Sequence, residues 1–334
     1  MTSILAVDMG YGYTKAVADT SQRFITPSLV GPSESIRFES DVVKANGSAI
    51  EVHVDGRRFF VGEQAELQSA SASQTLDATR TGSLEQKALF YAVASELVGT
   101  KDNALSIITG LPVADFDERN KALLCAMLEG PHIIERTGKH QRAFTVENVY
   151  TLPQAMGSLF TLVLDKKGKL VDGDLAAGRV AILDVGMLTT NLIMVDRLRY
   201  VETGSDSITV GMGEALGKIA KDLKRQHSLD WTLQMSRVDR AVRARHVEVY
   251  DERVDISDMV DKHLTAIGDV IISKARSLWG AGADLKAVIV TGGGARELTT
   301  HVERAYPHTR QMGAGDPQFG NVVGYLRAGL RRFG

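Results

Sequence analysis

Two segments of the chain combine an aspartate with glycines in a way that suits phosphate chemistry. In the first, the apolar run 4–7 leads into Asp8, and Gly10, Gly12 and Lys15 follow. Glycines let the backbone approach phosphate oxygens, and successive N–H groups form an anion-binding nest. An aspartate binds Mg²⁺ directly or through water, and a lysine meets a phosphate as a point charge. The segment therefore predicts a site for a magnesium-bound phosphate.

The second segment repeats this design in the other half of the chain. The apolar run 180–183 precedes Asp184, and Gly186, Thr189 and Thr190 follow. Each turn on its own also fits an ordinary hairpin, in which an aspartate ends a strand and glycines form the turn. The recurrence of the pattern after two apolar strands favours the phosphate interpretation and indicates two halves of related design.

Three consecutive glycines, Gly292, Gly293 and Gly294, follow the strand-like residues 287–290. We interpret them as backbone that passes close to a flat ligand such as a nucleobase with its ribose; a loose turn is the alternative. Gln154 lies at the start of an expected helix, where its amide could orient a water molecule. An isolated glutamine is more often a surface residue, so Gln154 gains weight only together with the phosphate turns.

Alternating strand and helix patterns must position these residues, which indicates an α/β fold. Strands are expected over residues 4–7, 16–18, 23–26, 50–54, 57–61, 105–109, 180–183, 192–195 and 287–290, with a hairpin over 133–149. Helices are expected over residues 84–98, 153–164, 211–225, 259–271, 297–305 and 319–333. A further helix is expected to begin at Asp115, because Glu118 stands three positions on, in capping-box spacing.

The composition is that of an ordinary globular protein. The chain has 334 residues, and 39 lysines and arginines against 41 aspartates and glutamates give a formal net charge of −2. A chain of this length usually divides into about two domains. The near-neutral net charge gives no strongly basic surface for nucleic acid, so direct DNA binding is not expected. Cys125 is the single cysteine, and no segment reaches the roughly 18 apolar residues of a membrane span. A cytoplasmic location without membrane association is expected.

Five segments, in this order, resemble the nucleotide-binding signature of the superfamily that contains actin, sugar kinases and heat-shock chaperone ATPases. They are residues 8–15, 152–157, 183–195, 288–298 and 320–329. One such motif would be weak evidence, but five in register span nearly the whole chain.

Within that superfamily the chain is most similar to the bacterial and archaeal actin-like proteins of the ParM/StbA type. The runs at 7–15, 61–65 and 109–113 carry this resemblance. Two residues depart from the family pattern: Met187 stands where Gly or Tyr is common, and Asn191 stands where many relatives carry Asp. The missing carboxylate at Asn191 changes the expected surroundings of the metal.

The resemblance implies two duplicated actin-like, ribonuclease H-like domains around a nucleotide cleft. The first would comprise residues 1–150 and 320–334, with a small β insertion at about 31–73. The second would comprise residues 151–319, with a helical insertion at about 205–280.

The same resemblance implies roles for individual residues. Asp8 and Asp184 would hold the hydration shell of Mg²⁺, Gln154 would orient the attacking water, and Lys15 would contact the phosphates. Further nucleotide contacts are implied for residues of the glycine turns and the start of the helix 211–225: Gly10, Tyr11, Gly12, Tyr13, Gly186, Met187, Thr189, Thr190, Gly213, Glu214, Lys218, Gly292, Gly293 and Gly294. Phosphoryl transfer would then proceed by positioning and charge neutralisation, and slowly, because an amide is a poor base.

The function implied by this resemblance is a filament-forming protein that binds and slowly hydrolyses ATP, with GTP as the alternative nucleotide. Its partners would be further copies of itself and an adaptor protein bound to DNA or other cargo, in plasmid segregation or cytoskeletal positioning. A small-molecule kinase of the same superfamily is the alternative, although no aspartate base for an acceptor hydroxyl and no zinc-binding Cys/His cluster is evident. A chaperone or activase is a further alternative.

Overall fold

The computed structural model describes residues 2–34, 50–69, 80–231, 235–312 and 316–334, and it divides into two compact units. Unit 1 comprises Met1–Lys169 and Asn321–Gly334, and unit 2 comprises Leu170–Gly320. A domain boundary at residue 150 would fall inside strand β9 (Arg142–Pro153). Because β9 pairs with its neighbour in the sheet as far as Pro153, residues 151–169 remain with unit 1.

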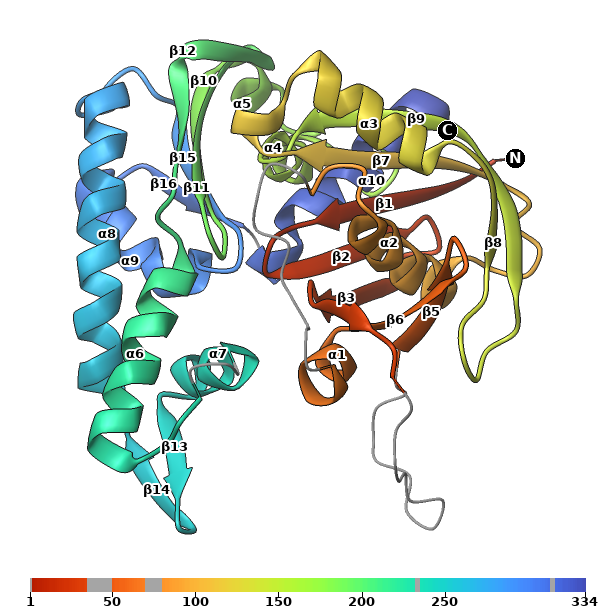
Figure 1. Cartoon of the computed structure of the whole chain (residues 1–334). Helices are drawn as coiled ribbons and strands as arrows, with labels where there is room; N and C mark the ends of the chain where they lie inside the picture. The colour runs from red at the N-terminus through yellow and green to blue at the C-terminus, as the bar shows by residue number, and fades with distance from the viewer. Residues whose placement is uncertain (1, 35–49, 70–79, 232–234, 313–315) are drawn as a thin grey trace. The chain divides into compact units, whose positions relative to one another are not determined.

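Unit 1 is built on a six-stranded sheet in the order β3-β2-β1-β7-β9-β8 (Figure 1). Its strands besides β9 are β1 (Ser3–Met9), β2 (Tyr13–Ala18), β3 (Arg23–Pro27), β7 (Ala104–Leu111) and β8 (Gly130–Ile134). Strand β1 pairs antiparallel with β2 and parallel with β7. The expected hairpin around the first glycine turn is confirmed, and it places Asp8 opposite Lys15.

A second, three-stranded sheet in unit 1 corresponds to the expected β insertion. It has the order β4-β6-β5, with β4 (Val30–Pro32), β5 (Ile50–Val54) and β6 (Arg57–Val61). Residues 35–49 and 70–73 of that insertion lie outside the described residues. The described helices of unit 1 are α1 (Glu63–Gln68), α2 (Leu84–Leu97), α3 (Glu118–Leu128), α4 (Met156–Val163) and, apart from its first residue, α10 (Gly320–Phe333).

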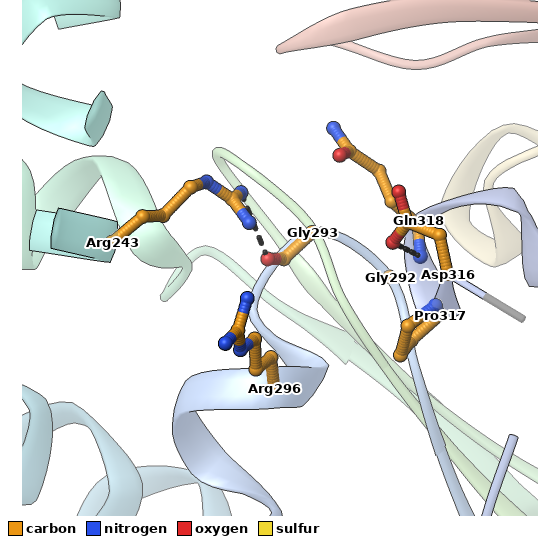
Figure 2. A pocket seen from close by; sticks show the side chains of 7 residues that line it. All are labelled: Arg243, Gly292, Gly293, Arg296, Asp316, Pro317 and Gln318. Carbon is orange, nitrogen blue, oxygen red and sulfur yellow. Dashed lines mark hydrogen bonds between the residues drawn. The ribbon is translucent and has the colours of Figure 1, made fainter. Parts of the chain in front are cut away.

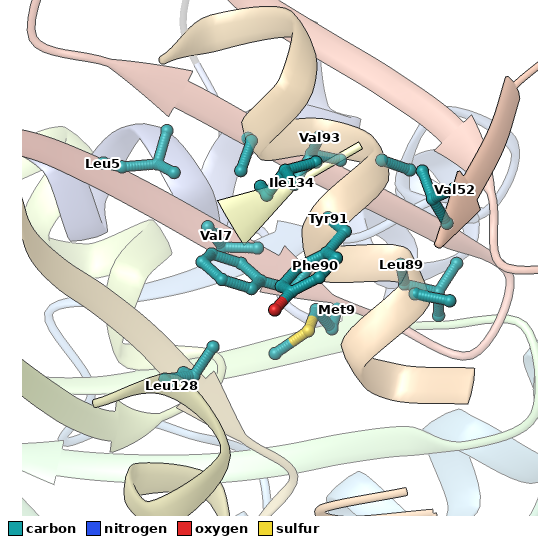
Figure 3. Close-up of a cluster of buried hydrophobic side chains, with 14 of the residues drawn as sticks. Leu5, Val7, Met9, Val52, Leu89, Phe90, Tyr91, Val93, Leu128 and Ile134 are labelled. Atoms are coloured by element: carbon teal, nitrogen blue, oxygen red, sulfur yellow. The ribbon is translucent and has the colours of Figure 1, made fainter. Parts of the chain in front are cut away.

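Helix α2 is buried on nearly all sides because it packs against strands of both sheets of unit 1. Phe90 and its neighbours on α2 meet Leu5 and Val7 of β1 and Val52 of β5 in one apolar cluster (Figure 3). Ten of the fourteen residues of α2 are buried, so α2 lies within the core. This cluster holds β1, and therefore Asp8 at its end, against the rest of the unit.

The helix expected to begin at Asp115 begins later, and that prediction was wrong. Residues Val113–Asp115 form a single 3₁₀ turn, and α3 starts at Glu118. The cap is Asp117, whose carboxylate accepts from the Asn120 N–H at 2.8 Å. An aspartate directly before the helix satisfies that orphan amide, so Asp115 does not serve as the cap.

Unit 2 repeats the strand arrangement of unit 1. Its five-stranded sheet has the order β12-β11-β10-β15-β16. The strands are β10 (Arg179–Val185), β11 (Thr190–Asp196), β12 (Arg199–Ile208), β15 (Ala287–Thr291) and β16 (Thr309–Gln311). Three antiparallel strands are followed by two parallel ones, as in β3-β2-β1-β7-β9. The prediction of two halves of related design is confirmed.

Helices and a small hairpin complete unit 2. Its described helices are α5 (Gly173–Ala177), α6 (Met212–His227), α7 (Met235–Ala244), α8 (Ser257–Trp279) and α9 (Ala295–Ala305), and the 3₁₀ turn Pro317–Phe319 precedes α10. The helical insertion expected at about 205–280 also contains the hairpin β13 (His246–Val249) and β14 (Glu252–Asp255). None of the helices in the described ranges has the length and apolar character needed to cross a membrane.

Candidate functional site

The first phosphate turn brings three of the predicted residues together inside unit 1. Asp8, 1% exposed at the end of β1, accepts at Oδ2 from Lys15 Nζ at 3.0 Å and at Oδ1 from Gln154 Nε2 at 2.8 Å. Because the amide nitrogen of Gln154 is directed to Asp8, Oε1 is the atom of that amide that can accept a hydrogen bond from water. Asp8, Lys15 and Gln154 therefore form one polar cluster.

Ser28 and Arg80 hold the carbonyl groups of this turn. Gly10 O accepts from Ser28 Oγ at 2.6 Å and from Arg80 Nη2 at 2.8 Å, and Gly12 O accepts from the Ser28 N–H at 2.9 Å. A Cβ at residue 10 would lie 3.0 Å from Tyr13 O, so the turn is tight at that point. These bonds fix the backbone orientation of the predicted phosphate-binding residues 10–13.

Arg80 was not predicted from the sequence, because an isolated arginine gives no pattern. Its buried guanidinium lies 4.8 Å from the centre of the Tyr11 ring. Burial lowers the pKa of Arg80, whereas Tyr11, Asp8 and Asp115 act in the opposite direction. Burial and Asp117 raise the pKa of Asp115, which also accepts a hydrogen bond from Tyr11. A guanidinium stays charged in proteins, so Arg80 adds a buried cation to the turn beside Lys15.

The second phosphate turn is closed by the start of α6. Gly186 N–H donates to Thr189 O at 2.9 Å, and Gly186 O accepts from the Met212 N–H at 3.0 Å. Met187 O accepts from the Gly213 N–H at 2.7 Å. The first amides of α6 therefore hold the turn in place, and this is the position that the structure gives to Gly213 and to the unusual Met187.

Three further predicted residues of unit 2 are also engaged within the fold. Thr190 is fully buried, and its hydroxyl donates to Val210 O at 2.7 Å. Glu214 and Lys218 are exposed on α6 and form an ion pair with each other at 2.7 Å. Thr190 thus serves to hold the turn, and Glu214 and Lys218 neutralise each other.

Asp184 lies at the end of β10 with an amide directly opposite. It is 4% exposed and pairs across the hairpin with Asn191, which is 3% exposed. The Oδ1 atom of Asn191 is buried and has no hydrogen-bond partner among the residues that the structure describes. A buried acceptor without a donor is costly, so this oxygen is suited to a donor from outside the chain, such as a metal-bound water.

Mg²⁺ fits this arrangement. Among the described residues, no group of three or more His, Cys, Asp and Glu side chains could hold a metal ion. Mg²⁺ in proteins usually keeps several waters and is held by one or two carboxylates together with substrate phosphates, without a cage of protein ligands. Asp184, with the free acceptor of Asn191 opposite it, supplies what such a hydrated ion requires.

A cavity of about 330 Å³ lies within unit 2 at the glycine run. It is lined by Arg243, Gly292, Gly293, Arg296, Asp316, Pro317 and Gln318. Figure 2 shows Arg243 and Arg296 on one side of the Gly292–Gly293 turn and Asp316–Gln318 on the other. Arg243 donates to Gly293 O at 3.3 Å and to Asp239 Oδ2 at 3.0 Å. Planar guanidinium groups stack on aromatic faces, so the cavity suits a nucleobase.

Gly292 joins this cavity to Asp184. Its φ of +89° favours glycine, and a Cβ there would overlap Asp184 Oδ1 and lie 2.5 Å from Val185 O. Beside it, Gly293 has open space where a Cβ would stand, whereas a Cβ at Gly294 would lie 2.7 Å from Val185 Cγ1. Gly292 and Gly294 thus approach the protein's own Asp184 and Val185, and the interpretation of the glycine run as backbone close to a nucleobase and ribose stays a prediction.

The cavity contains residues that the sequence patterns did not indicate. Arg243 lies in the charged stretch 237–248, from which no function was predicted. Arg243 stands four residues after Asp239, on a helix whose Val238 and Val242 are buried. This spacing is the sequence signal that could have indicated an ordered Arg243 side chain. Arg296 directly follows the glycine run, and residues 316–318 are separated from it in the sequence and carry no motif.

Two family models match the chain. Residues 6–157 match the N-terminal domain of actin-like proteins, and residues 182–304 match the C-terminal domain of the MreB-like archaeal actin homologues. Archaeal actin homologues of Thermoplasma volcanium and Thermoplasma acidophilum are each 24% identical to the chain, over 98% of its length and 99% of theirs.

Solved structures of actin-like proteins have the same fold as this chain. An archaeal actin homologue in complex with ADP covers 99% of this chain with 100% of its own, at 20% identity and a TM-score of 0.80. A subunit of a 15-stranded ParM filament from Clostridium botulinum covers 98% of this chain with 99% of its own, at 22% identity and a TM-score of 0.80. At these identities the structural likeness establishes the fold.

Proposed function

We propose that this chain, which belongs to the actin-like proteins through both its N-terminal and its C-terminal domain, binds ATP with Mg²⁺, hydrolyses it slowly and assembles into filaments under nucleotide control. One observation carries the nucleotide assignment: Gly292 brings the arginine-lined cavity directly against the carboxylate of Asp184. A base-binding cavity beside a metal-binding carboxylate suits a nucleoside phosphate. The ADP complex of the related archaeal protein supports this assignment.

The roles proposed for the residues are those that the family resemblance implies, with Arg243 and Arg296 added from the cavity in unit 2. Arg243, Arg296 and the glycine run hold the adenosine, and the turns at Gly10–Tyr13 and Gly186–Thr189 hold the phosphates. Asp184 and Asp8 orient waters of the metal shell, and Lys15 neutralises phosphate charge. When bound, Mg²⁺ supplies charge neutralisation at the phosphate oxygens.

Gln154 aligns the attacking water through Oε1, because its Nε2 is held by Asp8. Water attacks the terminal phosphorus, the bond to the bridging oxygen breaks, and ADP and phosphate leave without a covalent intermediate. The Gln154 amide is itself a poor base, so turnover is slow.

The cellular setting is part of the proposal. The protein acts in the cytoplasm, in DNA or plasmid segregation or in cytoskeletal positioning, and its partners are further copies of itself and an adaptor protein bound to DNA or cargo. ATP is the nucleotide, and GTP is the alternative that a competition experiment distinguishes. The filament that the related ParM protein of Clostridium botulinum forms supports self-assembly.

Sedimentation tests the assembly directly. At micromolar protein with Mg²⁺, we expect the protein to pellet with ATP and to remain largely in the supernatant without nucleotide, with filaments visible by electron microscopy only in the first sample. The physical reason is that a repeated head-to-tail contact that does not close into a ring generates a filament. Monomers in every nucleotide state, together with phosphate transfer to a small acceptor, would overturn this function in favour of a kinase.

Replacing Gln154 with alanine should lower kcat by roughly 10²-fold while nucleotide affinity stays nearly unchanged, because a neutral amide positions water without neutralising phosphate. Steady-state phosphate release and titration with a fluorescent ATP analogue separate the two quantities. Gln141→Ala is a matched control, since that glutamine is exposed and bonds only to Glu135 among the described residues. A large loss of affinity with normal kcat would contradict the role of Gln154.

A further inference from the structure

We propose that Tyr325 is a positioning residue for hydrolysis, because its hydroxyl holds the backbone of Gln154 in the place from which Gln154 aligns water. This inference rests on the proposed function of Gln154. Tyr325 lies on α10 and is fully buried. Its Oη donates to Gln154 O at 2.7 Å, across 171 positions of the sequence.

Gln154 needs such support because it lies between two regular elements. Strand β9 ends at Pro153, and α4 begins at Met156. The Gln154 N–H donates to Leu111 O at 2.8 Å, and Gln154 O also accepts a long bond of 3.3 Å from the Gly157 N–H. The bond from Tyr325 is therefore the shorter of the two that the described residues make to this carbonyl.

Close packing of α10 against α4 and β7 fixes the position of Tyr325. A Cβ at Gly110 would overlap the Tyr325 hydroxyl, and a Cβ at Gly324 would overlap Gly157 O. Ser158 and Asn321 add a side-chain hydrogen bond of 2.6 Å between α4 and α10. These glycines let α10 approach α4 and the end of β7 at backbone distance, so the tyrosine hydroxyl reaches Gln154 from a rigid base.

The hydrogen bond from Tyr325 and the cavity in unit 2 are connected along the chain. Asp316, Pro317 and Gln318 line the cavity in unit 2, and α10 begins at Gly320, two positions after Gln318. Tyr325 lies less than two turns into that helix. The helix that holds Gln154 is thus covalently continuous with a wall of the cavity.

The test compares two tyrosines that make the same kind of bond. Tyr325→Phe removes the hydroxyl at Gln154. Tyr306→Phe removes the hydroxyl of another fully buried tyrosine, which donates to Gly280 O at 3.2 Å within unit 2. We expect Tyr325→Phe to lower kcat by about fivefold to tenfold, since a small displacement of a catalytic group is costly, while ATP affinity changes less than twofold. Tyr306→Phe should keep wild-type kcat, although both variants melt at slightly lower temperature.

A double variant separates positioning from general destabilisation. Because Tyr325 acts through Gln154, Gln154→Ala with Tyr325→Phe should be no slower than Gln154→Ala alone. Wild-type kcat in Tyr325→Phe, or equal kcat losses in Tyr325→Phe and Tyr306→Phe, would overturn the inference while a slow Gln154→Ala left the proposed function standing. Normal kcat in Gln154→Ala would instead remove Gln154 from the reaction, and this inference with it.

Discussion

Replacing Asp184 with alanine should lower Mg²⁺-dependent ATP hydrolysis by about 10²-fold or more while the protein stays folded, as expected for the loss of one preorganised charged group. Asp184 lies near the end of β10, pairs in register with Asn191, whose Oδ1 has no hydrogen-bond partner among the described residues, and lies against Gly292 at the cavity. Without it, metal-bound waters lose their charged acceptor. Phosphate release measured across a Mg²⁺ titration shows whether excess metal restores the rate.

Asp196→Ala is the matched control for this experiment. Asp196 lies at the opposite end of the same β10–β11 hairpin, where it pairs with Arg179. Its removal alters the same two strands and should leave hydrolysis at the wild-type level. If Asp184→Ala turned over at the wild-type rate, Asp184 would have no place in the site.

Gly292→Ala is expected to cost both stability and activity, whereas Gly293→Ala keeps wild-type stability. At Gly292 the positive φ and the overlap of an added methyl with the Asp184 carboxylate strain the fold by about 1–3 kcal/mol and displace that carboxylate. At Gly293 no described atom lies within 4 Å of the added methyl, and the backbone is not in the left-handed region. Thermal unfolding should therefore separate the two variants.

Hydrolysis completes the comparison of the two glycines. Gly292→Ala should lose most of its Mg²⁺-dependent activity, because the Asp184 carboxylate, which we propose to act at the metal, can no longer take its place. Gly293→Ala should weaken nucleotide binding alone. Gly293 lines the cavity, so its added methyl would contact the base and leave the Asp184 carboxylate in place. Equal unfolding temperatures and equal rates for both variants would refute the assignment of Gly292 as the close contact.

Local features of the fold could be predicted because they depend on residues close together in the chain. The hairpins around Asp8 and Asp184 follow from an apolar run, a glycine turn and a second apolar run, and the structure contains both. The residue at which a helix starts is harder to predict. Asp115 and Asp117 are two positions apart, and only Asp117, next to α3, caps the helix. Such a choice depends on backbone geometry that residue types do not specify.

Local patterns in the sequence were enough to predict the repeated strand and turn design around the two aspartates, the glycine run and the resemblance to actin-like proteins. Which distant residues meet these segments follows only from the packing of the whole chain. Arg80 reaches Gly10 across 70 positions, Arg243 reaches Gly293 across 50, and Tyr325 reaches Gln154 across 171. The tertiary structure also showed that Thr190 and Gly213 hold a turn. Periodicity and turn chemistry are local signals, whereas a contact between distant residues exists only after the chain has packed, so no local pattern records it.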